Sequence, residues 1–545
     1  MVVFIDRTAD DRKHSAALFS QIPFLVTRMT SSDDAEMVEH VPHAPDPERP
    51  SRRRFFALGA SAAALVASRP VNAQPPRGRA PSPFPTGPTG SGRPDPSTVW
   101  TDPLLRLVRR ITMGMTSADV TLARSLGYAG YLDYQLRVSA IDDSAIESTI
   151  ATRLPFTQMT LPQLATQDGG EVENQLSDAS WYRAASSNAQ LRERMVEFWS
   201  DHFTISMTKV GYLKMADDRD VIRANALGSF PTLLKATAES GAMLVYLDQN
   251  RSRTPTPNQN YAREIMELHT LGVDGGYSQN DVAELSRILT GWSTGGAGVF
   301  SFNRGFHDRN AKTFMGRTFP AMASTASTAD MKAEGDTAIQ MLIDHPSTAR
   351  YVSWKMARWL LAYEPPPAVV TATAATYTRT GGNITAMVRT ILSSKNLTAS
   401  PAKYKRPFHL AISGLRAMDA QITNVRAARQ RADQMGMPLF RWEQPNGYPD
   451  RIDWWSGLVI TRWSYMQYLS TLNSATQTRV NSMQFRAPDT PDGVITQINT
   501  RLFGGEMPTS LRTQLVTYLR GGTYNDTRVR ETLSLAASAQ EFQWY

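Results

Sequence analysis

Apolar residues recur three and four positions apart along almost the whole chain from residue 103 onward, and this periodicity constrains the fold more than any other feature. It is the pattern of amphipathic helices that bury one face. The strict alternation that predicts strands is scarce, and residues 298–306 and 313–320 are the best candidates for a short hairpin. The sequence therefore predicts a mostly α fold: one large multi-helix domain over residues 101–545, in one or two lobes, with a short β-hairpin or loop-rich insert near 293–335.

The first hundred residues have a different character. Residues 74–100 are rich in Pro, Gly and Ser, which predicts a linker. Residues 51–56, SRRRFF, match the twin-arginine export pattern, and an apolar run and a small-residue cleavage site, VNA at 71–73, follow. The apolar run is roughly 11 residues long, whereas a membrane span needs about 20. We predict a leader and signal peptide over residues 1–73, a periplasmic or secreted location, and no transmembrane segment in the mature chain.

The composition limits the cofactors and partners. The chain contains no cysteine, which excludes disulfides, thiolate metal sites, iron–sulfur clusters and haem c. No nucleotide-binding glycine motif occurs. The formal net charge of +8 is spread along the chain without a recognised nucleic-acid module, so nucleic acid is not an expected partner. A mildly basic surface suits an extracellular or envelope polymer, including an anionic one.

Residues 260–292 concentrate ionisable side chains in a helix–glycine turn–helix pattern, NYAREIMELHTLGVDGGYSQNDVAELSRILTGW. Paired carboxylates can supply a general acid and a second carboxylate across a cleft. Glu264, Glu267 and His269 are therefore the predicted catalytic residues, with Glu264 and Glu267 as the acid–base pair. The alternative is structural: an Arg263–Glu267 surface ion pair, and a buried arginine that pairs with Glu264.

Five histidines follow residue 73, and two of them, His345 and His409, stand at expected helix starts, where structural roles are favoured. The remaining three histidines could hold a divalent metal as a cofactor, together with an acidic residue next to one of them. Neither H-E-x-x-H nor Glu-x-x-His occurs, so such a site would have to be assembled from separate helices. The candidate metal ligands are His202, His269, His307 and Asp308.

Residues 445–455, PNGYPDRIDWW, form a loop in which prolines and a glycine fix an irregular backbone. Its aromatic side chains can stack on sugar rings, although packing in the core is the more frequent role of tryptophan. The side chains predicted to bind substrate are Trp199, His202, Tyr261, Arg263, His307, Asp308, Tyr448 and Trp454.

Several blocks together resemble a known family. They are ERMVEFWSDHFTIS (193–206), the segment 260–292, FHDRNAKTFMG (306–316), DHPSTARYVSWKMARWL (344–360), YKRPFHLAISGLRAM (404–418) and PNGYPDRIDWW (445–455). They span most of the chain after residue 100 and resemble the bacterial DUF1800 family, large secreted proteins whose name records that no function was assigned. The resemblance implies no particular chemistry.

Export, paired carboxylates, aromatic loops and the lack of a nucleotide motif favour one function. We expect an exported hydrolase that acts on an extracellular or envelope polymer, most plausibly a glycan, by carboxylate acid–base catalysis. One alternative is a periplasmic enzyme that depends on a metal or another cofactor, such as an oxidoreductase loaded before export. The other is a non-catalytic surface-binding or assembly protein, which needs a complementary surface but no shifted pKa values.

Overall fold

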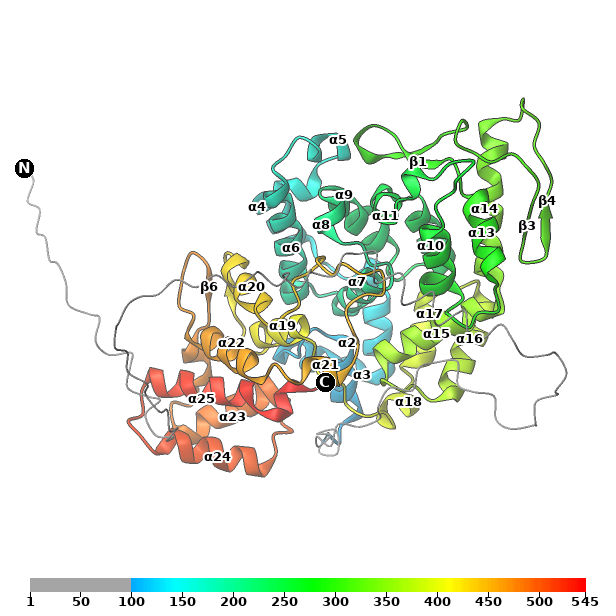
Figure 1. Cartoon of the computed structure of the whole chain (residues 1–545). Helices are drawn as coiled ribbons and strands as arrows, with labels where there is room; N and C mark the ends of the chain where they lie inside the picture. Colours follow the sequence, from blue (N-terminus) through cyan, green and yellow to red (C-terminus); the bar gives the residue numbers. More distant parts are fainter. Residues whose placement is uncertain (1–99) are drawn as a thin grey trace, which may run out of the picture. The chain divides into compact units, whose positions relative to one another are not determined.

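The structure, a computed structural model, describes residues 100–545. Helices make up nearly all the regular structure of these residues, and their strands form three two-stranded antiparallel sheets (Figure 1). The prediction of a mostly α fold is confirmed. The predicted leader, the signal peptide and the linker up to residue 99 lie outside the described residues. Within the described part of the chain, no helix is long and apolar enough to cross a membrane.

A first hydrophobic core is built from helices between residues 103 and 398. Fourteen α-helices contribute to it: α2 (Pro103–Ile111), α3 (Ser117–Leu136), α7 (Gln190–His202), α8 (Met207–Val210), α9 (Leu213–Ala216), α10 (Phe230–Ala238), α11 (Gly241–Tyr246), α12 (Asn260–Glu264), α13 (Gln279–Ile288), α14 (Thr328–Asp344), α15 (Pro346–Leu360), α16 (Pro367–Thr380), α17 (Ile384–Ile391) and α18 (Ser394–Thr398).

A second core is built mainly from the C-terminal third of the chain. Its helices are α4 (Ser144–Arg153), α6 (Gly169–Ser186), α19 (Pro407–Ala417), α20 (Arg426–Asp433), α21 (Ile452–Trp455), α22 (Val459–Thr471), α23 (Pro491–Phe503), α24 (Thr509–Arg520) and α25 (Asp526–Ser538). The short α5 (Leu161–Leu164) belongs to a small third cluster. All described residues fall within one compact unit, Ser82–Tyr545, so the two cores lie inside a single unit.

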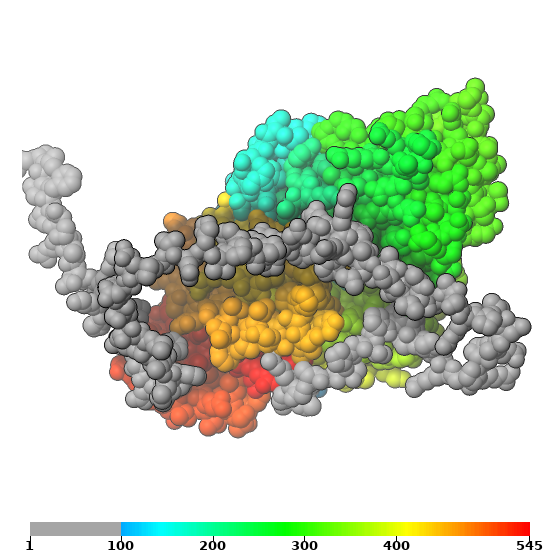
Figure 2. Space-filling view, in the orientation of Figure 1, coloured from blue at the N-terminus to red at the C-terminus, as the bar shows by residue number. Residues whose placement is uncertain are grey.

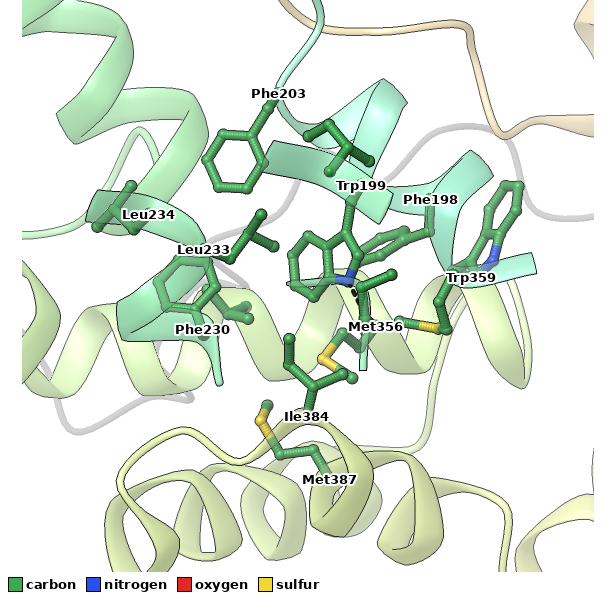
Figure 3. Packing of buried hydrophobic residues seen from close by; sticks show 14 of the residues in the cluster. Phe198, Trp199, Phe203, Phe230, Leu233, Leu234, Met356, Trp359, Ile384 and Met387 are labelled. Carbon is green, nitrogen blue, oxygen red and sulfur yellow. Dashed lines mark hydrogen bonds between the residues drawn. The ribbon is translucent and has the colours of Figure 1, made fainter. Parts of the chain in front are cut away.

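The centre of the first core is aromatic (Figure 3). Trp199 on α7 is completely buried between Phe198, Phe230 and side chains of α15 and α17. Its indole N–H donates to the carbonyl of Ala226 over 3.0 Å, so its one polar atom is satisfied. The helix α15 begins at Pro346, where His345 accepts a hydrogen bond from the backbone N–H of Ser347 at 3.1 Å. Packing against this core fixes the orientation of α7 and α15, the two helices that carry the site described below.

The predicted insert contains two of the sheets. Strand β1 (Trp292–Thr294) pairs with β2 (Phe300–Phe302), and β3 (Lys312–Phe314) pairs with β4 (Arg317–Phe319). The β3–β4 turn, Met315-Gly316, has two positive φ angles, as a two-residue hairpin with type I′ geometry requires. The predicted hairpin is confirmed. The third sheet joins β5 (Gln421–Ile422) to β6 (Thr478–Arg479).

Short non-α helices complete the secondary structure. The 3₁₀ segments are η2 (Val138–Ala140), η3 (Pro155–Gln158), η5 (Gln249–Arg251), η7 (Gly296–Gly298), η8 (Ser482–Phe485) and η9 (Gln540–Gln543). Two segments are π-helical: η4 (Asp217–Arg223) and η6 (Ile265–Thr270). The regular α-helix expected at the start of the 260–292 segment therefore changes to π geometry after Glu264, with Leu271 N–H bonded to the carbonyl of Met266.

Candidate functional site

A cavity of about 690 Å³ lies where side chains of the two cores meet. Its walls come from the end of α7, one face of α15 with the residues that follow it, Pro401 and Arg406, and the loop 446–454. The volume lies within the range of about 300–1,000 Å³ that is typical of ligand sites. Figure 2 shows orange surface, the colour of residues near 450, exposed on one face of the molecule.

The loop 446–454 supplies nine consecutive lining residues. Its geometry depends on Gly447, whose φ is +78° and where an added Cβ would collide with the backbone carbonyl oxygen of Asp201. The hydroxyl of Tyr448 donates to the carbonyl of Pro438 at 2.5 Å, and the indole of Trp455 donates to the carbonyl of Pro449 at 2.6 Å. The close approach of Gly447 to the backbone of Asp201 therefore places the loop against the end of α7, and the two hydrogen bonds fix the shape of the loop.

We predict that Gly447→Ala will displace this loop. A left-handed φ and the collision with Asp201 both oppose the new methyl group, and together they should lower the free energy of unfolding by about 1–3 kcal/mol. Ligand binding in the cavity should weaken by more than this loss of stability explains. Chemical denaturation and a binding titration check the two effects. Gly457→Ala is the matched control, because its added Cβ meets nothing within 4 Å.

Two carboxylates in the cavity are held by cations. Arg406 contacts both Glu197 and Asp201, each at 2.5 Å. Asp450 lies 2.7 Å from the ammonium of Lys403, and its backbone carbonyl accepts a hydrogen bond from Arg358 at 2.9 Å. Asp201 and Asp450 come from segments that are far apart in the sequence, and both line the same cavity.

The surroundings shift the pKa values of these two carboxyl groups in opposite directions. Burial raises the pKa of Asp201, the charge of Glu197 adds to this, and the guanidinium of Arg406 offsets only part of it. Burial also opposes the ionisation of Asp450, but the cations around it, chiefly Lys403 and Arg358, outweigh that cost and lower its pKa. Oppositely shifted carboxyl groups in one site are the arrangement that acid–base chemistry uses.

Aromatic faces make up much of the remaining wall. The aromatic lining residues are Phe198, Tyr351, Trp354, Trp359, Tyr363, Tyr448 and Trp454. Tyr351 and Trp354 are stacked on α15 with ring centroids 6.2 Å apart. Trp454 is 54% exposed and packs edge-on against Trp442, so one side of its indole stays open to solvent. Such faces suit apolar or sugar-ring stacking beside the charged groups.

Three of the residues predicted to bind substrate line this cavity: His202, Tyr448 and Trp454. His202 is nevertheless nearly buried, and its Nε2 lies 3.1 Å from the backbone carbonyl of His269. The two imidazole rings are 6.0 Å apart. Burial lowers the pKa of His202 well below its usual value and lowers that of His269 to about 3, so both rings are neutral at physiological pH.

The predicted acid–base pair lies beside the cavity rather than on its wall. Glu264 and Glu267 are half-buried, and the lining residues of the cavity include neither of them. Burial, together with the charge of Glu267, raises the pKa of Glu264 to about 7. The charge of Glu267 also reaches Tyr351, which does line the cavity. The catalytic role of the pair stays a prediction.

The raised pKa of Glu264 makes stability depend on pH. Folded Glu264 binds its proton more tightly than the unfolded chain does, so the free energy of unfolding should fall between pH 4.5 and 7. At pH 4, where Glu264 is protonated, we expect Glu264→Gln to change the stability by almost nothing. At pH 8 we expect it to stabilise the protein by about 1 kcal/mol, an effect that is kept small because solvent screens this half-buried group. Urea denaturation at both pH values measures the difference. Equal effects at the two pH values would contradict the shifted pKa.

Several predicted site residues have structural positions instead. Trp199 and Tyr261 are 0% and 1% exposed in the first core, so their predicted contact with substrate is corrected to core packing. Arg263 donates a hydrogen bond to Gln279 on α13 rather than pairing with Glu267.

The predicted pair His307 and Asp308 anchors the insert. His307 Nδ1 lies 2.8 Å from the carbonyl of Thr290, and its Nε2 lies 3.2 Å from Glu334. Asp308 forms an ion pair with Arg287 at 2.7 Å. Neither residue lines the cavity, and their predicted contact with substrate stays a prediction.

The predicted metal ligands are separated. His202 and His269 are neighbours, whereas His307 and Asp308 are engaged with partners of their own, as described above. Across residues 100–545, no three His, Asp or Glu side chains are grouped so that they could hold a metal ion. The four candidates therefore do not form the shared site that their residue types suggested.

The charged residues that give the cavity its chemistry were not predicted from the sequence: Asp201, Lys355, Arg358, Arg406 and Asp450. Each one lies inside a block that had already been singled out, at 193–206, 344–360, 404–418 or 445–455. Asp201 is adjacent to His202, and Asp450 is in the aromatic loop. Their positions inside these blocks were the one feature of the sequence that could have indicated these residues, because no local spacing connects one residue to another.

The same blocks fall within a match to a known family. The family DUF1800, described as a protein of unknown function, matches residues 106–544. No curated protein and no solved structure matches the chain. The family match includes α7, α15 and the loop 446–454, and hence almost every element that forms the cavity. On this coverage, the chain belongs to the DUF1800 family.

Proposed function

We propose that the protein is a hydrolase that cleaves glycosidic bonds in an extracellular or envelope polymer, with its active site in the 690 Å³ cavity. The observation that carries the proposal is the pair Asp201 and Asp450, whose pKa values are shifted in opposite directions in one cavity. Glycoside hydrolysis requires one protonated and one ionised carboxyl group on either side of the scissile bond. Asp201, whose pKa is raised, and Asp450, whose pKa is lowered, are the candidates for these two roles.

The roles follow from the directions in which the two pKa values are shifted. Asp201, with the raised pKa, would donate its proton to the glycosidic oxygen as the bond between that oxygen and the anomeric carbon breaks. Asp450, kept ionised by Lys403 and Arg358, would supply the second carboxylate, which assists attack on the anomeric carbon. Asp450 would take one proton from the water whose oxygen bonds to the anomeric carbon, and that proton would pass to solvent, from which Asp201 regains the proton that it gave to the leaving oxygen. This assignment places catalysis at Asp201 and Asp450 rather than at Glu264 and Glu267.

The aromatic wall supports a sugar substrate. Stacking on tyrosine and tryptophan faces binds sugar rings without requiring charge, and Trp454, which lines the cavity and is 54% exposed, presents such a face. Export through the twin-arginine route, predicted from residues 51–73, would bring the site to envelope polymers.

The proposal is tested by incubating the purified protein with a panel of neutral and acidic polysaccharides and measuring the release of new reducing ends. We expect release from at least one polymer, at a rate proportional to the amount of protein. Binding to a polysaccharide without any cleavage would instead favour the non-catalytic binding alternative. If the protein neither binds nor cleaves any polymer of the panel, the proposal is contradicted.

A further inference from the structure

Lys355 differs from the other cations of the cavity. It lies on α15, is partly buried and lines the cavity. Among the residues that the structure describes, its ammonium has no carboxylate within 4 Å and no hydrogen-bond acceptor. Its nearest defined contact is the ring of Tyr351, whose centroid is 5.9 Å away.

The other cations on the cavity wall are paired with carboxylates. Arg406 is paired with Glu197 at 2.5 Å, and Arg451 with Asp453 at 2.6 Å. Arg358 lies 3.8 Å from a carboxylate oxygen of Glu364. Among the described lining residues, Lys355 is therefore the one cation that has no carboxylate within 4 Å.

An unpaired ammonium in a partly desolvated cavity is unfavourable unless an anion joins it. Asp201 and Asp450 act on Lys355 only through longer-range electrostatic attraction. Their direct partners are other cations, Arg406 for Asp201 and Lys403 for Asp450. Burial, the main cause, lowers the pKa of Lys355 to about 8, so the ammonium form still predominates at neutral pH. An anionic group of a ligand would supply the direct partner that the described residues do not provide for Lys355.

Resting on the proposed function, we infer that Lys355 binds the carboxylate of an acidic sugar, so that the substrate class is a glycan containing uronic acids. The ammonium of a lysine is a compact single charge that can pair with the carboxylate of a uronic acid. Arg358 and Arg406 are already committed to protein acceptors. The aromatic faces beside Lys355 on α15, Tyr351 and Trp354, would stack on the ring that carries the carboxylate.

The test uses oligouronates of several linkages and, for each one, the same oligomer after its carboxyl groups have been reduced to alcohols. Binding to the full chain is measured by titration calorimetry. We expect at least one acidic oligomer to bind about 10-fold or more tightly than its reduced partner. Lys355→Met should weaken binding of that acidic oligomer by about 10–100-fold and change binding of the reduced partner by less than about 3-fold.

Two further variants separate the local effect from charge and folding. Lys395→Met removes a charge from an exposed lysine on α18 and should leave both affinities unchanged. Lys355→Arg should keep part of the preference for the acidic oligomer, and thermal unfolding shows whether each variant is folded.

The outcomes also distinguish this inference from the proposed function. Cleavage or binding of neutral glycans with no preference for acidic oligomers, or an unchanged preference in folded Lys355→Met, overturns the inference and leaves the hydrolase proposal standing. A preference for sulfated over carboxylated oligomers overturns the carboxylate assignment. Failure to bind or cleave any glycan overturns both.

Discussion

Replacement of Asp201 by asparagine is expected to lower kcat by about 10²–10⁴-fold, the usual contribution of a general acid. The substitution keeps the size of the side chain and an acceptor for Arg406, but it removes the proton that the leaving oxygen needs. Arg406 also retains its second partner, Glu197, at 2.5 Å. The raised pKa means that folding does not favour ionised Asp201, so the variant should unfold within a few degrees of the wild type.

The control for Asp201→Asn is Asp453→Asn. Asp453 also lines the cavity, but its side chain is 53% exposed and pairs with Arg451 near the surface. Its replacement should leave kcat within about 3-fold, since exposed ion pairs contribute little. If both variants lose activity equally, Asp201 acts through its contribution to the overall charge of the cavity and not by donating a proton. If Asp201→Asn unfolds at much lower temperature, the residue is structural.

Trp199→Ala should cause the largest loss of stability, about 3–5 kcal/mol, because it removes a fully buried indole and leaves a cavity that the surrounding helices cannot close. The indole lies among Phe198, Phe203 and Phe230, with Met356 nearby (Figure 3). The variant also leaves the carbonyl of Ala226 without its donor at 3.0 Å. Guanidinium denaturation measures the change.

The matched control is Trp454→Ala, which removes the same side chain from the loop 446–454. Trp454 is 54% exposed, so its loss should cost less than about 1 kcal/mol of stability while weakening the binding of glycans in the cavity. The reverse pattern, with Trp199→Ala stable but unable to bind, would restore the predicted substrate role of Trp199.

Local signals in the sequence predicted the local structure well. The proline after His345 marks the start of α15, the Met315-Gly316 turn closes a hairpin, and the apolar periodicity identifies the helices. The π geometry of η6 was not predictable, because π and α turns use the same residue types and differ only in how tertiary packing places the carbonyls. The burial of Trp199 could not be predicted from the sequence, because it depends on packing partners that lie far along the chain. Trp199 was therefore predicted to contact substrate.

The candidate site was predicted only in part, for a related reason. The density of charges at 260–292 is a local feature, and it directed attention to Glu264 and Glu267. The cavity instead combines Asp201, Lys355 and Asp450, which meet only after α7 and α15 pack together and the loop 446–454 folds against them. Such an arrangement has no fixed spacing in the sequence. The aromatic loop was found because its residues are contiguous.

The most direct test of the account compares the initial rates of Asp201→Asn, Asp450→Asn and Glu264→Gln on one polysaccharide that the wild-type protein cleaves, with circular dichroism to establish that each variant is folded. The account predicts that the two aspartate variants lose at least about 100-fold in rate and that Glu264→Gln stays within about 3-fold of the wild type. Loss of activity in Glu264→Gln, with both aspartate variants active, would contradict it and return catalysis to the glutamate pair.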